Sequence, residues 1–399
     1  MKSVTPFLAL LCAFAASARA AEALDPIRSV EIGKQRELLV NGKPFFPIMS
    51  WAQATSRLEK LRGLGFNTFN GSGKTAAEAL EKAKAAGGYA MLHWDRFESS
   101  AKGHPSLLAY SLKDEPDMGV QKDKPRNSVE EVKGWYESVR RNDPSRPVFL
   151  NFTASFQSSQ GADKPGVLDY YKAAAAHAEI LCFDNYPVYQ ANRDDRLIWV
   201  AEGVSELRAL GGSHKPVWAW IETSKGSKWI TYERQKDVTP EITRTEVWMA
   251  VIRGATGIGY FTHAWRPAFT EFAPDEAMQA ELKRTNEQLT RLAPAILSAP
   301  SARKCSVAFK DGLPGEVLLR EHDGHVYLFA NNLDMKDLGK REDAVKAAYR
   351  GGTATLSVEG LKTGTEIEVL DEGRTLKAGD GVFVDAFPPL GIHLYRFKP

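Results

Sequence analysis

Two short stretches decide the fold of this chain: Leu112-Lys113-Asp114-Glu115-Pro116 and Val217-Trp218-Ala219-Trp220-Ile221-Glu222-Thr223. In each, an apolar run typical of a buried strand leads into a glutamate. Their separation is about three times the roughly 30- to 36-residue repeat of a barrel built from alternating strands and helices. We therefore expect the carboxylates of Glu115 and Glu222 to lie at the same rim of one barrel, facing each other.

The chain around these stretches alternates between apolar, β-rich runs and amphipathic helical stretches from Arg36 to about Ala295. The eight strand candidates are Phe46–Ser50, Thr68–Asn70, Ala90–His93, Ala109–Lys113, Val148–Asn151, Ile180–Asp184, Val217–Ile221 and Gly257–Thr262. The helical patterns are Gln53–Leu64, Ala76–Ala86, Ser128–Arg141, Val167–Ala178, Asp195–Leu210, Pro240–Arg253 and Asp275–Leu292. Strands that alternate with helices imply a parallel sheet, and eight such units in about 260 residues predict an α/β fold, a closed (β/α)8 TIM barrel.

One unit of this barrel fits poorly. Only the segment from Asp95 to Leu108 separates the third and fourth strand candidates. We therefore expect the third helix to be truncated. An open, doubly wound sheet is the alternative fold.

The sequence changes character after Pro294 and Pro300. Asp323-Gly324 is a strong hairpin signal between two alternating runs. Short strand candidates and glycine-rich turns then follow one another at the spacing of a small antiparallel β-sandwich, at Glu316–Arg320, His325–Ala330, Thr353–Val358, Glu366–Leu370, Val382–Val384 and Ile392–Phe397. The predicted organisation is a signal peptide at 1–20, a barrel at 21–298 and a β-sandwich at 299–399.

The first twenty residues are typical of a cleavable signal peptide. Lys2 supplies a positive charge, Pro6 to Ala16 an apolar core, and Ala18-Arg19-Ala20 a small-x-small cleavage site. No later run approaches the 18 apolar residues of a membrane span. We expect a secreted or periplasmic protein that is cleaved near Ala20 and is not inserted in a membrane.

Composition argues against several other classes of partner. The formal net charge is +2, and removal of Lys2 and Arg19 brings it to about zero, so there is no basic surplus for nucleic acid. No His-x-x-x-His or paired Cys/His spacing indicates a metal site. We expect no metal, no cofactor and a monomer.

The ends of the predicted strands carry polar and aromatic side chains, which is where a parallel barrel places its functional groups. Amides and acids bind hydroxyl groups, and flat rings stack on the C–H face of a pyranose, so this set predicts a carbohydrate site. Packing at the rim, or a hydrogen-bonded structural role for a histidine, is the alternative for individual members. Besides the two glutamates, the candidate substrate-binding residues are Trp51, Asn70, His93, Trp94, Asp114, Asn151, Tyr186, His263 and Trp265.

This pattern resembles clan A, the retaining glycoside hydrolases built on (β/α)8 barrels. In that clan the acid/base glutamate ends the fourth strand and the nucleophile glutamate ends the seventh, which are the positions of Glu115 and Glu222. The resemblance implies that Tyr186 hydrogen-bonds the nucleophile and that Trp265 is the platform beneath the sugar. It extends over the whole barrel, and clan members often carry a C-terminal β-sandwich. We assign no numbered family.

One residue departs from the clan pattern: Asp114 stands where the clan usually has asparagine. An aspartate can accept a hydrogen bond from the 2-hydroxyl of a sugar. Its negative charge is also expected to raise the pKa of Glu115, as a proton donor requires.

The resemblance implies an exported retaining glycoside hydrolase that cleaves β-linked polysaccharides or oligosaccharides, with a preference for endo action on a β-glucan or β-mannan. Glu222 would attack the anomeric carbon while Glu115 protonates the leaving oxygen, which requires the two carboxyl groups to lie about 5 to 5.5 Å apart. The alternatives are a barrel that binds carbohydrate without catalysis and a transglycosylase that uses the same covalent intermediate.

Overall fold

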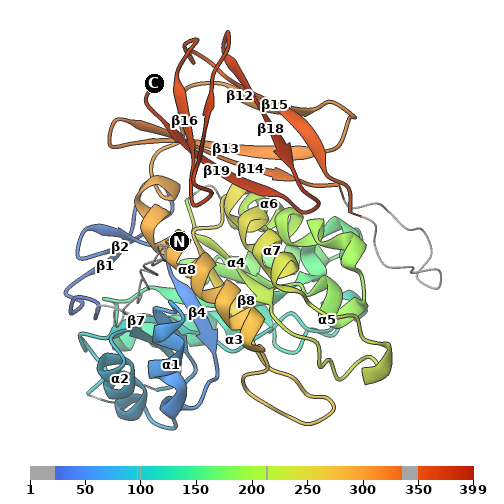
Figure 1. The fold of residues 1–399 in the computed structure, drawn as a ribbon. Coiled ribbons are helices and arrows are strands. Elements are labelled where there is room, and N and C mark those ends of the chain that lie inside the picture. Colours follow the sequence, from blue (N-terminus) through green and yellow to red (C-terminus); the bar gives the residue numbers. More distant parts are fainter. Residues whose placement is uncertain (1–22, 97, 99, 213, 335–348) are drawn as a thin grey trace, which may run out of the picture.

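The computed structural model describes residues 23–399 except 97, 99, 213 and 335–348 (Figure 1). The predicted signal peptide lies outside the described residues, so its cleavage and the export of the protein stay predictions.

Eight parallel strands close into a barrel in which each strand pairs with the next along the chain and the last returns to the first. This is the predicted (β/α)8 barrel, and it excludes the open-sheet alternative. Every strand candidate corresponds to an observed strand. They are β4 (Ile48–Trp51), β5 (Thr68–Asn70), β6 (Tyr89–His93), β7 (Leu107–Ser111), β8 (Val148–Thr153), β9 (Ile180–Asp184), β10 (Val217–Glu222) and β11 (Gly257–Phe261).

Helices surround the barrel at most of the predicted positions. Among the described residues between β6 and β7 there is no helix, which agrees with the predicted truncation of the third unit. The helices are α1 (Leu58–Gly63), α2 (Ala76–Ala85), α3 (Val129–Asn142), α4 (Val167–Ala175), α5 (Pro187–Ala191), α6 (Ile198–Gly211), α7 (Pro240–Ile252) and α8 (Glu276–Ile296). Short 3-10 turns lie at Thr55–Arg57, Val120–Lys122, Ala154–Phe156, Ser158–Gln160, Asp194–Arg196 and Tyr232–Arg234.

Two helix starts follow from their capping residues. Ser128 and Glu131 form a capping box at the start of α3, in which each side chain accepts a hydrogen bond from the other residue's backbone N–H. The Thr239 hydroxyl accepts a bond from the Ile242 N–H ahead of α7. These bonds fix where the two helices begin, and therefore how long the preceding loops at the barrel mouth are.

A small antiparallel sheet precedes the barrel and was not predicted. It consists of β1 (Val30–Ile32), β2 (Leu38–Val40) and β3 (Lys43–Phe45). Val30, Leu38 and Val40 pack in one apolar cluster with inward-facing barrel residues such as Trp218. Because β3 leads directly into β4, the sheet fills the amino-terminal end of the barrel.

Two antiparallel sheets form the predicted C-terminal β-sandwich. One contains β12 (Cys305–Phe309), β15 (Gly352–Val358) and β18 (Val382–Phe387). The other contains β13 (Gly315–His322), β14 (His325–Asn332), β19 (Ile392–Phe397), β16 (Glu366–Val369) and β17 (Arg374–Lys377). The predicted hairpin is confirmed, because Asp323 and Gly324 join β13 to β14 and both have positive φ angles, as a type I′ turn requires.

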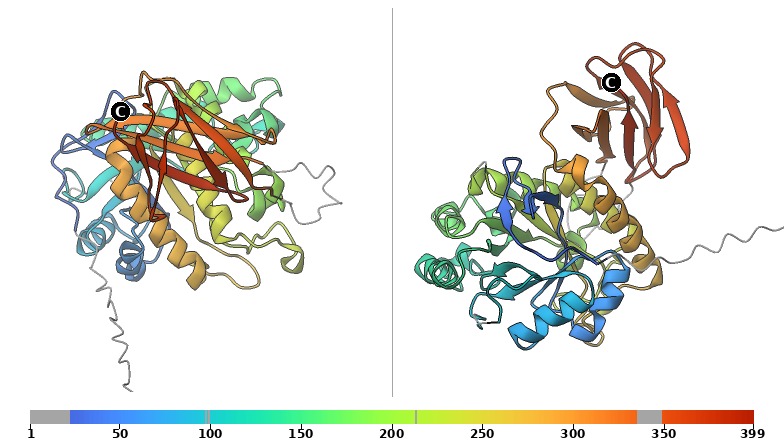
Figure 2. Two further views of the ribbon diagram at one scale, coloured as in Figure 1. Left: turned by 45° about the horizontal axis from the view of Figure 1, so that its top comes forward. Right: turned by 90° about the vertical axis from the view of Figure 1, so that its left-hand side faces the viewer.

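The sandwich packs against one side of the barrel, beside α7 and α8 (Figures 1 and 2). The Trp248 ring on α7 stacks on the Phe329 ring of β14, with the two centroids 5.6 Å apart. Arg291 of α8 and Asp371 form an ion pair of 2.6 Å across the same boundary. The contact is therefore apolar in part, which fits a structural role for the sandwich.

Among the described residues, no helix has both the length and the apolar character needed to cross a membrane.

Candidate active site

A cavity of about 160 Å³ lies at the carboxyl end of the barrel strands. Most of the side chains around it are acids or aromatic rings. Its lining residues are Trp51, Asp114, Glu115, Met118, Asn151, Asp184, Tyr186, Tyr189, Gln190, Trp220, Lys228, Trp229, Phe261 and Trp265.

A larger hollow of about 710 Å³ lies on the sandwich, along β16 and β17. Two of its three acids are paired with arginines, since Glu368 binds Arg396 at 2.6 Å and Asp371 binds Arg291 at 2.6 Å. The cavity in the barrel mouth is the better candidate despite its smaller size, because the carboxyl ends of the strands are where parallel barrels hold their functional groups.

Glu115 stands on an unusual backbone at this mouth. Its φ angle is +47°, in the left-handed region that residues other than glycine rarely adopt. Its N–H donates to the Asn151 carbonyl of β8 at 3.2 Å, and Pro116 follows it. Strained backbone of this kind persists only where the surroundings hold it, and it is concentrated at functional sites.

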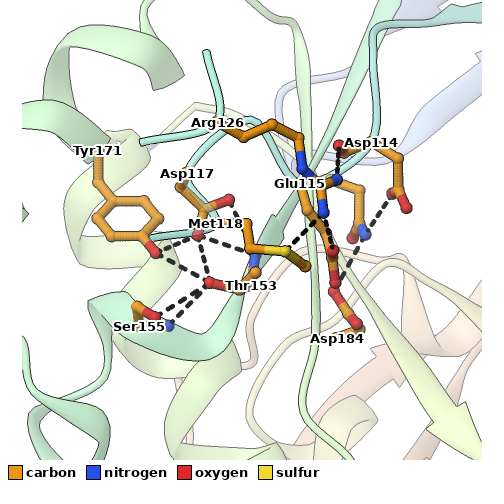
Figure 3. A network of polar contacts seen from close by, with 10 residues as sticks. Asp114, Glu115, Asp117, Met118, Arg126, Thr153, Ser155, Tyr171 and Asp184 are labelled. Carbon is orange, nitrogen blue, oxygen red and sulfur yellow. Dashed lines mark hydrogen bonds and ion pairs between the residues drawn. The ribbon is translucent and has the colours of Figure 1, made fainter. Parts of the chain in front are cut away.

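A buried carboxylate two residues further on holds this loop in place (Figure 3). Asp117 is fully buried and accepts hydrogen bonds from the Thr153 N–H at 3.0 and 3.1 Å, from the Thr153 hydroxyl, and from the Tyr171 hydroxyl at 2.5 Å. Burial raises the pKa of Asp117 to about 6, against the lowering effect of these bonds. Asp117 thus ties the loop that carries Glu115 to the end of β8.

Three acids in the cavity form one connected group (Figure 3). The Asn151 amide nitrogen donates to Oδ1 of Asp114 at 2.9 Å and to Oδ1 of Asp184 at 3.1 Å. Asp184, at the end of β9, shares a side-chain hydrogen bond with Glu115. Burial, and then the charges of Glu115 and Asp114, raise the pKa of Asp184 well above its usual value. This favours the protonated form of Asp184, which can donate the hydrogen bond to Glu115.

The pKa of Glu115 itself is raised to about 7. Burial is the largest cause and the charge of Asp114 the second, as the sequence predicted for that aspartate. The hydrogen bond from Asp184 and the charge of Arg126, whose Nη2 lies 3.5 Å from Oε2 of Glu115, oppose the rise. A carboxyl group with this pKa can donate and accept a proton near neutral pH.

Aromatic rings form much of the rest of the cavity and its rim. Tyr186 stacks on Phe261 with centroids 4.9 Å apart. Trp229 and Trp265 are 66% and 38% exposed, which is unusual for such large apolar side chains. The ammonium group of Lys228 lies over both indole rings, 4.5 and 5.4 Å from their centroids.

The expected meeting of Glu115 and Glu222 in one cleft is corrected by the structure. Glu222 ends β10, but its side chain is fully buried and it is not among the residues that line the cavity. Its oxygens accept hydrogen bonds from the backbone N–H groups of Val188 at 2.9 Å and Tyr189 at 2.5 Å, at the start of α5. These partners also replace the expected bond from the Tyr186 phenol.

A second buried carboxyl group accompanies Glu222. Glu246 of α7 is fully buried, and the charge of Glu222 acts on it. Burial raises the pKa of Glu222 to about 7, and burial together with the charge of Glu222 raises that of Glu246 well above its usual value. Burial therefore disfavours ionisation of both carboxyl groups.

The structure divides the other sequence candidates into two sets. Trp51, Asp114, Asn151, Tyr186 and Trp265 line the cavity. Four candidates are not among its lining residues: Asn70 is buried at the end of β5, the His93 ring binds Asp95 at 2.7 Å, Trp94 stacks on Trp135 of α3, and the buried His263 packs against Trp51 with ring centroids 5.0 Å apart.

Several lining residues escaped the sequence analysis. Asp184 ends the sixth barrel strand and so carried the same positional signal as the residues that were chosen. Trp220 belongs to the buried core and also lines the cavity, with 3% of its surface exposed. Lys228 and Trp229 lie in the loop after β10, where no periodic pattern marks a role. Within the part of the chain that the structure describes, no cluster of His, Cys, Asp and Glu side chains is arranged to hold a metal ion.

Comparisons with known proteins find glycoside hydrolases. Residues 124–291, less than half of the chain, match the model of glycoside hydrolase family 42, described as beta-galactosidase. A solved structure described as a glycoside hydrolase has a TM-score of 0.54 at 11% identity, covering 93% of this chain and 96% of its own. A family 5 glycoside hydrolase from Bacteroides vulgatus ATCC 8482 has a TM-score of 0.53 at 13% identity, covering 93% and 94%. No curated protein sequence matches.

At these identities the solved structures show the fold that this chain shares with glycoside hydrolases. The predicted resemblance to glycoside hydrolases built on (β/α)8 barrels is confirmed at that level, without a numbered family. The partial family match adds independent support for a glycosidase.

Proposed function

We propose that this protein is an exported glycoside hydrolase in which Glu115 is the acid and base, and that it cleaves β-linked oligosaccharides or polysaccharides with retention of configuration. The observation that carries the proposal is Glu115 itself. It is a carboxyl group with a pKa raised to about 7, on strained backbone, in an aromatic-lined cavity at the carboxyl end of a barrel.

The chemistry assigned to Glu115 has two steps. Protonated Glu115 donates to the oxygen of the leaving sugar as the glycosidic bond breaks. The resulting carboxylate then removes a proton from the water that attacks the anomeric carbon. Arg126 stabilises this carboxylate between the steps, because its guanidinium group lies 3.5 Å from Oε2.

The rim of the cavity supports an extended substrate and endo action. Four exposed large apolar side chains gather there: Met118, Trp229 and Trp265 line the cavity, and Phe269 packs on Trp265 with ring centroids 4.9 Å apart. Exposed apolar patches mark binding surfaces, and aromatic rings suit the C–H faces of successive sugars. Export is proposed from the signal-like residues 1–20 alone.

Hydrolysis of a panel of β-linked polysaccharides, oligosaccharides and aryl β-glycosides, with sizing of the products, tests the proposal. We expect internal cleavage of at least one polymer and loss of that activity in Glu115→Gln. Glu130→Gln is the matched control, because Glu130 is exposed on α3 outside the cavity. Absence of hydrolysis across the panel, or full activity of Glu115→Gln, would reject the proposal.

A further inference from the structure

The acids that line the cavity lie on one connected side of it. They are Asp114, Glu115 and Asp184. The Asn151 amide is hydrogen-bonded to both Asp114 and Asp184, and Asp184 is hydrogen-bonded to Glu115. Cleavage through a covalent glycosyl-enzyme requires a second carboxylate about 5 to 5.5 Å from the acid, placed to attack the anomeric carbon. Asp184 is hydrogen-bonded to Glu115, and Glu222 is buried outside the cavity. Asp114, the remaining lining acid, lies on the same side as Glu115, at the ends of the neighbouring strands β7 to β9. None of the lining acids is therefore placed across the cavity from Glu115, where that nucleophile would have to be.

Asp114 has the properties of a receptor for one particular substituent. A carboxylate only accepts hydrogen bonds, whereas the asparagine usual at this position in clan A also donates. Oδ1 of Asp114 is already bound by the Asn151 amide, so the side chain is held in one orientation with its other oxygen available. Asp114 adjoins Glu115 in the chain and lines the same cavity, so it lies beside the sugar whose bond Glu115 would cleave.

We propose that the sugar bound beside Glu115 carries a 2-acetamido group, and that the carbonyl oxygen of this group is the nucleophile. This rests on the function proposed above. The acetamido N–H donates to Asp114, which orients the amide and stabilises the positive charge that develops as the carbonyl oxygen attacks. The substrate class is thus a 2-acetamido-2-deoxy-β-glycoside.

The proposed hydrolysis needs no reactant besides the glycoside and water. In the first step the amide oxygen bonds to the anomeric carbon, the glycosidic bond breaks, and the proton of Glu115 passes to the leaving oxygen. This gives a cyclic oxazolinium ion paired with the Asp114 carboxylate. In the second step water attacks the anomeric carbon, its proton passes to Glu115, and the bond to the amide oxygen breaks. Two inversions leave the configuration retained.

The cavity also offers apolar surface for the acetyl methyl group. Trp220 forms its floor, and the stacked rings of Tyr186 and Phe261 form part of its wall. Burial of a small apolar substituent against such rings is favourable because it removes apolar surface from water. A 2-hydroxyl group would leave this surface unused.

The test compares matched pairs of substrates with the wild-type protein: 4-nitrophenyl 2-acetamido-2-deoxy-β-D-glucoside and -galactoside against the corresponding 2-hydroxy glycosides, and the β-1,4-linked tetrasaccharides of both kinds. We expect kcat/KM to be at least about 100-fold higher for the acetamido member of a pair. Replacing the acetyl group by trifluoroacetyl is expected to lower kcat at least about tenfold, because fluorine withdraws electrons from the attacking oxygen.

Asp114→Asn adds a second readout, with Asp123→Asn as its matched control because Asp123 is exposed on the same loop. We expect kcat on acetamido substrates to fall about 10- to 100-fold in Asp114→Asn and to stay unchanged in the control. Equal or faster cleavage of the 2-hydroxy glycosides, or no effect of fluorination, overturns this inference and leaves the proposed function standing. Failure to cleave any of these glycosides or the wider panel overturns both.

Discussion

Glu115, which follows β7, and Glu222, which ends β10, share one sequence signal and occupy opposite environments. Glu115 stands on strained backbone in a cavity, with 16% of its side chain exposed, beside Asp184 and Arg126. Glu222 has no exposed surface, accepts hydrogen bonds from two backbone N–H groups and has the buried Glu246 as a neighbour. The pKa of each is raised to about 7, chiefly by burial.

A perturbed pKa at a strand end therefore does not by itself identify a catalytic acid. The two sites differ in whether a substrate can reach the carboxyl group and in whether its oxygens already have hydrogen-bond partners within the protein. The oxygens of Glu222 have their partners within the protein, whereas Glu115 faces a cavity that a substrate can enter. The comparison assigns chemistry to Glu115 and structure to Glu222.

The largest effect is expected from Glu115→Gln. Glutamine cannot donate the proton that the leaving oxygen needs, so kcat/KM should fall about 10²- to 10⁴-fold. The loss should shrink for an aryl glycoside with a 2,4-dinitrophenyl leaving group, which departs without protonation. Steady-state kinetics on both substrates measures this, and an equal loss on both would contradict the assignment of Glu115 as the acid.

The pH dependence of the wild-type protein gives the next effect. Glu115 must be protonated to act as the acid, and its pKa is raised to about 7. The value of kcat/KM should therefore fall as the pH rises above about 7, by about tenfold per unit. Asp114→Asn removes the charge that is the second cause of the rise, after burial, so the fall should begin at lower pH in that variant. A fall that begins at the same pH in both proteins would contradict this coupling.

The anchor of the Glu115 loop gives a smaller effect. Asp117→Ala leaves the Thr153 N–H and the Tyr171 hydroxyl without their buried acceptor, which should cost about 1–3 kcal/mol of stability. The strained backbone of Glu115 loses its support, so kcat should fall about tenfold with little change in KM. Denaturant unfolding and kinetics together measure this. Ser155→Ala, at the edge of the same network, is the control, and a kcat equal to wild type in Asp117→Ala would show that the anchor does not position Glu115.

Periodicity predicted the eight barrel strands, the shortened third unit and the sandwich because each rests on apolar patterns several residues long. It missed β1, β2 and β3, whose three residues each are too short for a pattern. It also missed β12 and β17 of the sandwich, and α5, a single turn after Tyr186.

The position of a residue at a strand end was predicted well, and the direction of its side chain was not. Trp220 and Glu222 are two residues apart and share strand parity, yet Trp220 lines the cavity and Glu222 does not. The difference arises from the N–H groups at the start of α5 and from Glu246 on α7, which reach Glu222 only in the folded barrel. Asp184 escaped notice for the converse reason, because only folding brings it to Glu115 and Asn151.

The smallest effect on rate, and the most direct test, comes from Glu222→Gln assayed on the best substrate below pH 7. Because Glu222 is buried outside the cavity, we predict kcat/KM within about threefold of wild type. Between about pH 4.5 and about pH 7, Glu222 is ionised in the unfolded chain but stays protonated in the folded protein, so the free energy of unfolding falls as the pH rises. This fall should be smaller in Glu222→Gln, which has no proton to lose at this position. A natively folded Glu222→Gln protein whose kcat/KM is about 1000-fold or more below wild type would contradict the account and make Glu222 a catalytic residue.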